Sequence, residues 1–164
     1  MKKALLIGIN DYPEGNELTG CIEDINSVKA AIERHGDGSP NFGVKMMPNV
    51  QTSGEVMAAI RKLFAGNDDT ALFYFSGHGY MNSTGAEIVM PQDIATPGQY
   101  YTGIQMSTIM SIVNTSKVRN KIIILDCCQT VSDRGSSNLM TADEMTSMST
   151  MATEVARDIK DRRK

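Results

Sequence analysis

The chain of 164 residues has no tryptophan and no apolar run that approaches the length of a membrane span. Asn10, Asp11 and Pro13 interrupt its first apolar stretch, which is therefore too short for a signal peptide and is better explained as a buried strand. In the absence of an export signal we expect a cytosolic protein whose three cysteines are reduced thiols. Two of these cysteines are adjacent in the sequence, and adjacent cysteines rarely form a disulfide.

The chain also lacks a large excess of charge of either sign. Its formal net charge is −3, which gives no electrostatic basis for binding nucleic acid or an anionic membrane surface. Hydrophobic residues make up 41% of the chain and charged residues 21%, values close to those of ordinary globular proteins. We therefore expect a folded domain of ordinary size with a real hydrophobic core.

Strand and helix patterns alternate along the chain. Uninterrupted apolar strands separated by helices predict an α/β fold, a three-layer sandwich whose mainly parallel sheet carries helices on both faces. The predicted strands are residues 3–9, 44–47, 70–75 and 121–125, the predicted helices are 21–34, 53–64, 106–113 and 141–159, and a hairpin is predicted over 80–92.

Two reactive side chains follow two of these strands directly. His78 stands between two glycines after the third strand, and Cys128 follows the strand over residues 121–125. Parallel strands present their carboxyl ends at one edge of the sheet, so His78 and Cys128 are expected to lie close together. An imidazole can activate a thiol for acyl transfer, and the backbone N–H groups of Gly79 and Cys128 could bind the developing oxyanion.

Each of these residues also has a structural explanation. His78 could be an ordinary loop histidine, and Cys127 or Cys128 could be a small core residue at a strand end. Either explanation would serve for one residue alone. Gly-His-Gly after one strand and Asp-Cys-Cys after the next are together better explained by catalysis. A zinc site is not expected, because adjacent cysteines cannot easily face one metal.

These motifs resemble the catalytic motifs of the metacaspases and other caspase-like cysteine peptidases. The resemblance extends over residues 3–130, in the order and spacing of that family. It is carried by "ALLIGINDY" (4–12), "LTGCIEDI" (18–25), "YFSGHG" (74–79), "EIVMPQD" (87–93) and "IIILDCCQT" (122–130).

The resemblance implies that Cys128 is the nucleophile and His78 the catalytic histidine. It further implies cleavage after Arg or Lys, with a basic-residue pocket built from Cys21, Asp24, Ser76 and Asp126. A pocket that holds two carboxylates and little positive charge should bind a positively charged substrate side chain, which agrees with this specificity. Asp24 could instead be a solvated charge near a helix N-terminus, and Asp126 could be a turn residue at the end of a strand.

The chain also departs from the family pattern. Gln129-Thr130-Val131 replaces the usual His-Ser-Gly after the nucleophile. Residues 103–106 replace an expected acidic pair, and Asp93 alone makes no calcium site, so we expect no cofactor, with calcium as the open alternative.

The resemblance further implies a small subunit whose strands complete the sheet. We therefore expect residues 1–135 to be a large-subunit-like catalytic domain, and residues 136–164 to be a loop and an amphipathic helix that could link it to that small subunit. The terminal Arg162-Arg163-Lys164 could be a product of self-processing or a solvated helix end.

Two functions follow from these observations. The first is a cysteine endopeptidase that acts on protein or peptide substrates after Arg or Lys, in regulatory proteolysis such as cell death or defence signalling. The alternative is a catalytically inactive caspase-like scaffold or binding module, which the change at Gln129-Thr130 and the missing strands would favour.

Overall fold

A computed structural model describes residues 1–83, 85–94, 103–127 and 129–131 of the chain. The chain divides into two units, Met1–Gln129 and Thr130–Lys164, and the first contains the sheet and its helices. None of the helices among the described residues combines the length and the hydropathy that crossing a bilayer demands.

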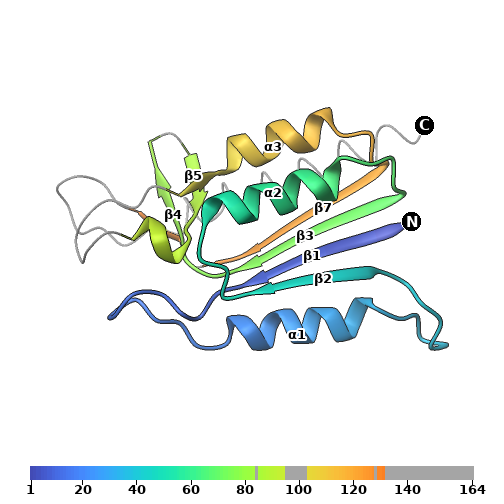
Figure 1. Cartoon of the computed structure of the whole chain (residues 1–164), viewed down its shortest axis with the longest axis horizontal. Coiled ribbons are helices and arrows are strands. Elements are labelled where there is room, and N and C mark those ends of the chain that lie inside the picture. Colours follow the sequence, from blue (N-terminus) through green and yellow to red (C-terminus); the bar gives the residue numbers. More distant parts are fainter. Residues whose placement is uncertain (84, 95–102, 128, 132–164) are drawn as a thin grey trace. The chain divides into compact units, whose positions relative to one another are not determined.

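The centre of the first unit is a four-stranded, entirely parallel sheet with the strand order β2-β1-β3-β7 (Figure 1). Every residue of the central strand β3 is buried, as expected for a parallel strand covered on both faces. The four strands are β1 (Lys2–Gly8), β2 (Gly43–Pro48), β3 (Thr70–Ser76) and β7 (Asn120–Asp126).

Among the described residues three helices cover the sheet, with α1 on one side and both α2 and α3 on the other (Figure 1). Alternate side chains of β1 explain the two layers: Ala4 and Leu6 pack with Ile25 of α1, whereas Leu5 and Ile7 belong to the core formed with α2 and α3. The three helices are α1 (Cys21–Ile32), α2 (Ser53–Phe64) and α3 (Met106–Thr115).

A small antiparallel arrangement follows β3. The strand β4 pairs with β5, and β5 pairs in turn with the two residues of β6. Gly85 allows the hairpin to turn because its φ of 122° is accessible only to glycine at low cost. The remaining elements of this unit are β4 (Gly79–Asn82), β5 (Gly85–Ile88), the 3₁₀ turn η1 (Pro91–Asp93) and β6 (Ile104–Gln105), and the short strand β8 (Gln129–Val131) begins at the last residue of the unit.

The α/β class, with a mainly parallel sheet and helices on both faces, is confirmed. The four main strands and the first three helices lie where their patterns predict them. Helix α1 ends two residues early, because the N–H of His35 donates to the carbonyl oxygen of Ser39 at 2.8 Å instead of to the carbonyl four residues before it. The helix predicted over 141–159 and the domain boundary predicted after residue 135 lie outside the described residues and remain predictions.

Candidate active site at the carboxyl edge of the sheet

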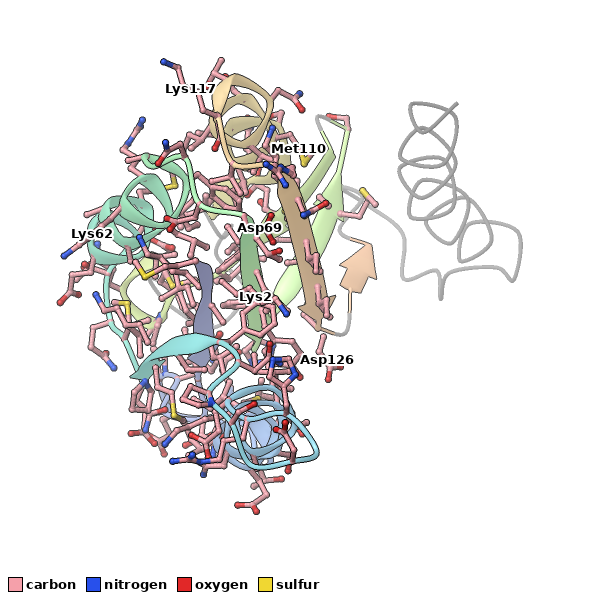
Figure 2. All side chains as sticks on the ribbon, turned by 90° about the vertical axis from the view of Figure 1, so that its right-hand side faces the viewer. Lys2, Lys62, Asp69, Met110, Lys117 and Asp126 are labelled. Carbon is pink, nitrogen blue, oxygen red and sulfur yellow. The ribbon has the colours of Figure 1, made fainter. Side chains whose placement is uncertain are left out.

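The carboxyl ends of three neighbouring strands meet in register at one edge of the sheet. Ser76, the last residue of β3, is aligned with Gly8 of β1 on one side and with Asp126 of β7 on the other. Figure 2 labels Asp126 at the end of β7. The sequence predicts that residues following β3 and β7 lie at a common edge, and the register of the two strands confirms this.

The first carboxylate of this edge comes from α1. Ser76 is buried, and its hydroxyl donates a hydrogen bond of 2.8 Å to Oδ2 of Asp24, which is half-buried in the first turn of α1. The two residues are 52 positions apart in the sequence, so the contact depends on the packing of α1 against the sheet. Two of the four residues predicted for a basic pocket are therefore in direct contact.

The second carboxylate, Asp126, is exposed at the rim and is held by a residue that no sequence motif indicates. The phenol of Tyr74 donates a hydrogen bond of 2.8 Å to Oδ2 of Asp126. Tyr74 and Ser76 are two residues apart on β3, so their side chains lie on the same face of the sheet. That spacing was the available signal, but an aromatic residue within a buried strand is usually a core residue.

The surroundings of Tyr74 keep its phenol protonated. Burial is the main cause that raises its pKa above the ordinary value of 10.0, and the hydrogen bond to Asp126 and the charge of Asp24 act in the same direction. The phenol is therefore a hydrogen-bond donor throughout the neutral range. The edge thus carries two carboxylates, each with one oxygen bound to a hydroxyl of β3.

Cys21 begins α1 at this same edge. Its backbone N–H donates to the side-chain oxygen of Asn10 at 3.0 Å, which satisfies one of the N–H groups left open at a helix start. Gly20 before it has a left-handed φ of 105°. A Cβ on Gly8 would collide with the backbone oxygen of Cys21, so this glycine lets the start of α1 approach β1 closely.

His78 is half-buried, and the loop between β1 and α1 fixes its ring. Its Nε2 lies 2.7 Å from the carbonyl oxygen of Asn16, a contact in which the nitrogen must carry the proton because a carbonyl only accepts. In the neutral imidazole Nδ1 then has the lone pair. The ring also meets that of Tyr12 edge-on, with 4.4 Å between their centroids. Neither Asn16 nor Tyr12 was predicted, because a backbone carbonyl and a loop tyrosine leave no side-chain pattern in the sequence.

The segment after β7 lies against the segment after β3. A Cβ on Gly79 would lie 2.8 Å from Sγ of Cys127, so the first thiol of the cysteine pair packs against this glycine. Two segments about fifty residues apart in the chain therefore meet, as predicted. Cys128, the predicted nucleophile and second oxyanion donor, lies outside the described residues, and its role remains a prediction.

The direction of the Gly79 N–H follows from the strand pairing. Val89 donates to the carbonyl oxygen of His78 at 2.9 Å, which makes residues 78 and 89 a hydrogen-bonded position. Hydrogen-bonded and non-hydrogen-bonded positions alternate in an antiparallel pair. The next position pairs Gly79 with Ile88, so the N–H of Gly79 points away from β5.

Asp93, the carboxylate considered above for calcium, already has two internal partners. Its Oδ2 accepts hydrogen bonds from the Ser53 hydroxyl at 2.7 Å and from the Met90 N–H at 3.1 Å. Within the part of the chain that the structure describes, no three His, Cys, Asp or Glu side chains gather closely enough to hold a metal ion. Among the described residues Asp93 therefore has a structural role, and the expectation of no cofactor remains a prediction.

The sequence and the fold both match known proteins. A family model for the caspase domain matches residues 1–163. This chain is 38% identical to metacaspase-1 of Candida albicans and 37% identical to metacaspase-1 of Lodderomyces elongisporus, each over 86 residues. Each match covers 48% of this chain and 19% of the relative. Metacaspase-1 of Cryptococcus neoformans is 32% identical over 113 residues, which cover 59% of this chain and 25% of that protein.

The chain therefore spans only about a fifth to a quarter of the length of these curated relatives. A crystal structure of a Geobacter sulfurreducens protein has the same fold, with a TM-score of 0.57. The match covers 80% of this chain and 52% of that one, at 19% identity.

Proposed function

The chain belongs to the caspase domain family, and we propose that it is a cysteine endopeptidase that cleaves proteins after Arg or Lys, with His78 and Cys128 as the catalytic pair. One observation carries this proposal. The carboxylates of Asp24 and Asp126 are held at the sheet edge by hydroxyls of β3, the strand that leads directly into His78. A cationic side chain bound there would place the following peptide bond beside the histidine.

The proposed reaction begins with transfer of the Cys128 thiol proton to Nδ1 of His78, while Nε2–H stays bonded to the carbonyl of Asn16. The thiolate attacks the carbonyl carbon of the scissile peptide bond, and the N–H groups of Gly79 and Cys128 bind the oxyanion. When the C–N bond breaks, the imidazolium gives its proton to the leaving amine. Water then hydrolyses the thioester and regenerates the thiol.

The two carboxylates explain why the substrate side chain in the pocket should be a cation. Asp24 and Asp126 each give one oxygen to a hydroxyl of β3, which leaves Oδ1 of each carboxylate for the substrate. A guanidinium has five donors in a planar fork and can bond to carboxylates in two directions, whereas an ammonium acts as a point charge. We therefore expect cleavage after Arg to be faster than cleavage after Lys.

The proposed peptidase has a defined substrate, cellular setting and partner subunit. The substrate is a protein, the reaction needs no cofactor, and the setting is regulatory proteolysis in the cytosol, such as cell death or defence signalling. A small subunit would add strands beside β7, which is the last of the described strands in the order of its sheet. In support, β7 exposes two large apolar side chains, Ile122 (39%) and Ile124 (42%).

Fluorogenic peptides that end in Arg test the activity directly. The wild-type chain should release the fluorophore, Cys128→Ala should abolish release, and the matched variant Cys127→Ala should retain most of it. Release that survives Cys128→Ala would contradict the assignment of the nucleophile. If the wild type is inactive even with calcium and with a small subunit supplied, the scaffold function replaces the peptidase.

A further inference from the structure

The antiparallel pairing next to His78 is interrupted by a side chain. Val89 donates to the carbonyl of His78, as a regular hydrogen-bonded pair requires. The reciprocal bond is missing, because the N–H of His78 donates instead to the hydroxyl of Tyr12 at 2.9 Å. That hydroxyl donates onward to the carbonyl of Val89 at 2.8 Å. One hydroxyl group therefore stands where a direct backbone hydrogen bond would otherwise form.

The surroundings of Tyr12 are built around this hydroxyl. Tyr12 is buried, and burial raises the pKa of its phenol above the ordinary 10.0, so the group stays able to donate. A Cβ on Gly77 would lie 2.6 Å from the hydroxyl oxygen, so only glycine leaves room for it there. Phenylalanine would fill the same space, but it could neither accept from His78 nor donate to Val89.

The same loop also supplies the second contact to the histidine. The carbonyl oxygen of Asn10 accepts from the N–H groups of Tyr12 at 2.9 Å and Leu18 at 3.0 Å, which closes the loop on itself. Asn16 lies within this closed loop and presents its carbonyl to Nε2 of His78. The backbone and the ring of His78 are thus both held by residues of one loop.

We propose that Tyr12 is a positioning residue for His78: its hydroxyl holds the N–H of His78 out of the direct antiparallel pairing, so that the ring reaches Asn16 and keeps its proton on Nε2. The use of the other ring nitrogen as a base rests on the function proposed above, whereas the position of the ring does not. Without the hydroxyl, the N–H of His78 would lose its acceptor and turn toward the carbonyl of Val89, and the ring would turn with it. Nε2 would then lose the carbonyl of Asn16.

Nitrogen NMR of the imidazole rings tests this proposal in the purified, ¹⁵N-labelled chain. The chain has only two histidines, and His35 is exposed in a distant turn, so its signals serve as an internal reference. The wild type should show His78 as the Nε2–H tautomer, and Tyr12→Phe should shift it to the mixture of tautomers seen for an exposed ring. His35 should not change.

A second variant and a matched control separate positioning from folding. Gly77→Ala keeps the Tyr12 hydroxyl but places a methyl group 2.6 Å from it and 2.7 Å from the ring of Phe75, and it should shift the His78 tautomer in the same direction. The hydroxyl of Ser116 bridges two backbone groups in the same way, from Val118 N–H at 3.1 Å to the Phe64 carbonyl at 2.7 Å, at the other end of the sheet. Ser116→Ala should leave His78 unchanged.

The outcomes decide the proposal whether or not the chain proves to be a peptidase. If Tyr12→Phe keeps the Nε2–H tautomer, the positioning role is overturned. It is also overturned if Tyr12→Phe and Gly77→Ala both unfold while Ser116→Ala folds, because the hydroxyl would then serve the hairpin as a whole. If the wild type cleaves peptides, Tyr12→Phe should lower kcat by at least about tenfold with little change in KM.

Discussion

The charge of Asp24 can be removed without changing the shape of the pocket, which makes Asp24→Asn the sharpest test of the proposed preference for cations. Asparagine keeps an oxygen that can still accept the hydrogen bond from Ser76. Asp24 also lies in the first turn of α1, where loss of a negative charge costs only about 0.5 kcal/mol of stability. The fold should therefore survive, and the effect should appear in catalysis.

The expected magnitude follows from the hydrogen bond that the substrate would lose. A hydrogen bond that involves a charged group contributes about 1.5–3 kcal/mol. Asp24 is only half-buried, so solvent weakens its interaction with the substrate. We therefore expect a free-energy contribution in this range and not the larger loss seen when a fully buried ion pair is broken. Asp24→Asn should thus lower kcat/KM for peptides cleaved after Arg by about tenfold to 150-fold.

A pair of substrates isolates the charge interaction. Citrulline has nearly the shape of arginine but carries no charge, so Asp24→Asn should lower kcat/KM for the arginine peptide much more than for the citrulline peptide. The control Asp68→Asn removes a carboxylate at the opposite edge of the sheet, where Asp68 pairs with Lys3 at 2.6 Å. That variant should leave the ratio of the two substrates unchanged. Equal losses for both peptides in Asp24→Asn would refute the pairing of Asp24 with the substrate charge.

Two further predictions concern the same edge. Tyr74→Phe releases Asp126 from its hydroxyl partner and should weaken discrimination between the arginine and citrulline peptides by a few fold, without changing the His78 signals in NMR spectra. Gly8→Ala should lower the free energy of unfolding by about 1–3 kcal/mol in urea titrations, because the new methyl group meets the backbone of Cys21, which cannot move aside alone. Gly54→Ala, a change in α2 with open space around the new Cβ, should instead stabilise the chain slightly, by up to about 1 kcal/mol. An unchanged stability of Gly8→Ala would contradict the close approach of α1 to β1.

The sheet could be predicted because its strands carry a strong local signal. Strands such as β3 are buried on both faces, so they appear in the sequence as continuous apolar runs, and the glycines and polar residues that follow mark their ends. Once the strands are parallel, the proximity of Ser76 and Asp126 follows from topology alone. The two residues of β6 were missed, because so short a strand has no periodicity to detect.

The contacts that hold the site residues in place could not be predicted, and the physical reason is different. His78 and Tyr12 are 66 residues apart, and their hydrogen bond joins a backbone N–H to a hydroxyl. The contact with Asn16 uses a backbone carbonyl, which every residue possesses. Tyr74 is indistinguishable in the sequence from a core aromatic, although its hydroxyl reaches the rim. Patterns of residue type identify groups that react, but they carry little information about backbone groups that hold them.

The loop between β1 and α1 connects the two halves of the proposed site. On one side, the Asn10 side chain accepts from the first N–H of α1, the helix that carries Asp24. On the other side, Tyr12 and Asn16 hold His78. The loop is itself held from the residue that follows β2, since the side-chain oxygen of Asn49, which has a left-handed φ of 49°, accepts from the N–H of Asn10 at 2.8 Å. The pocket and the histidine therefore share one support, so a displacement of this loop would alter substrate selection and proton transfer together.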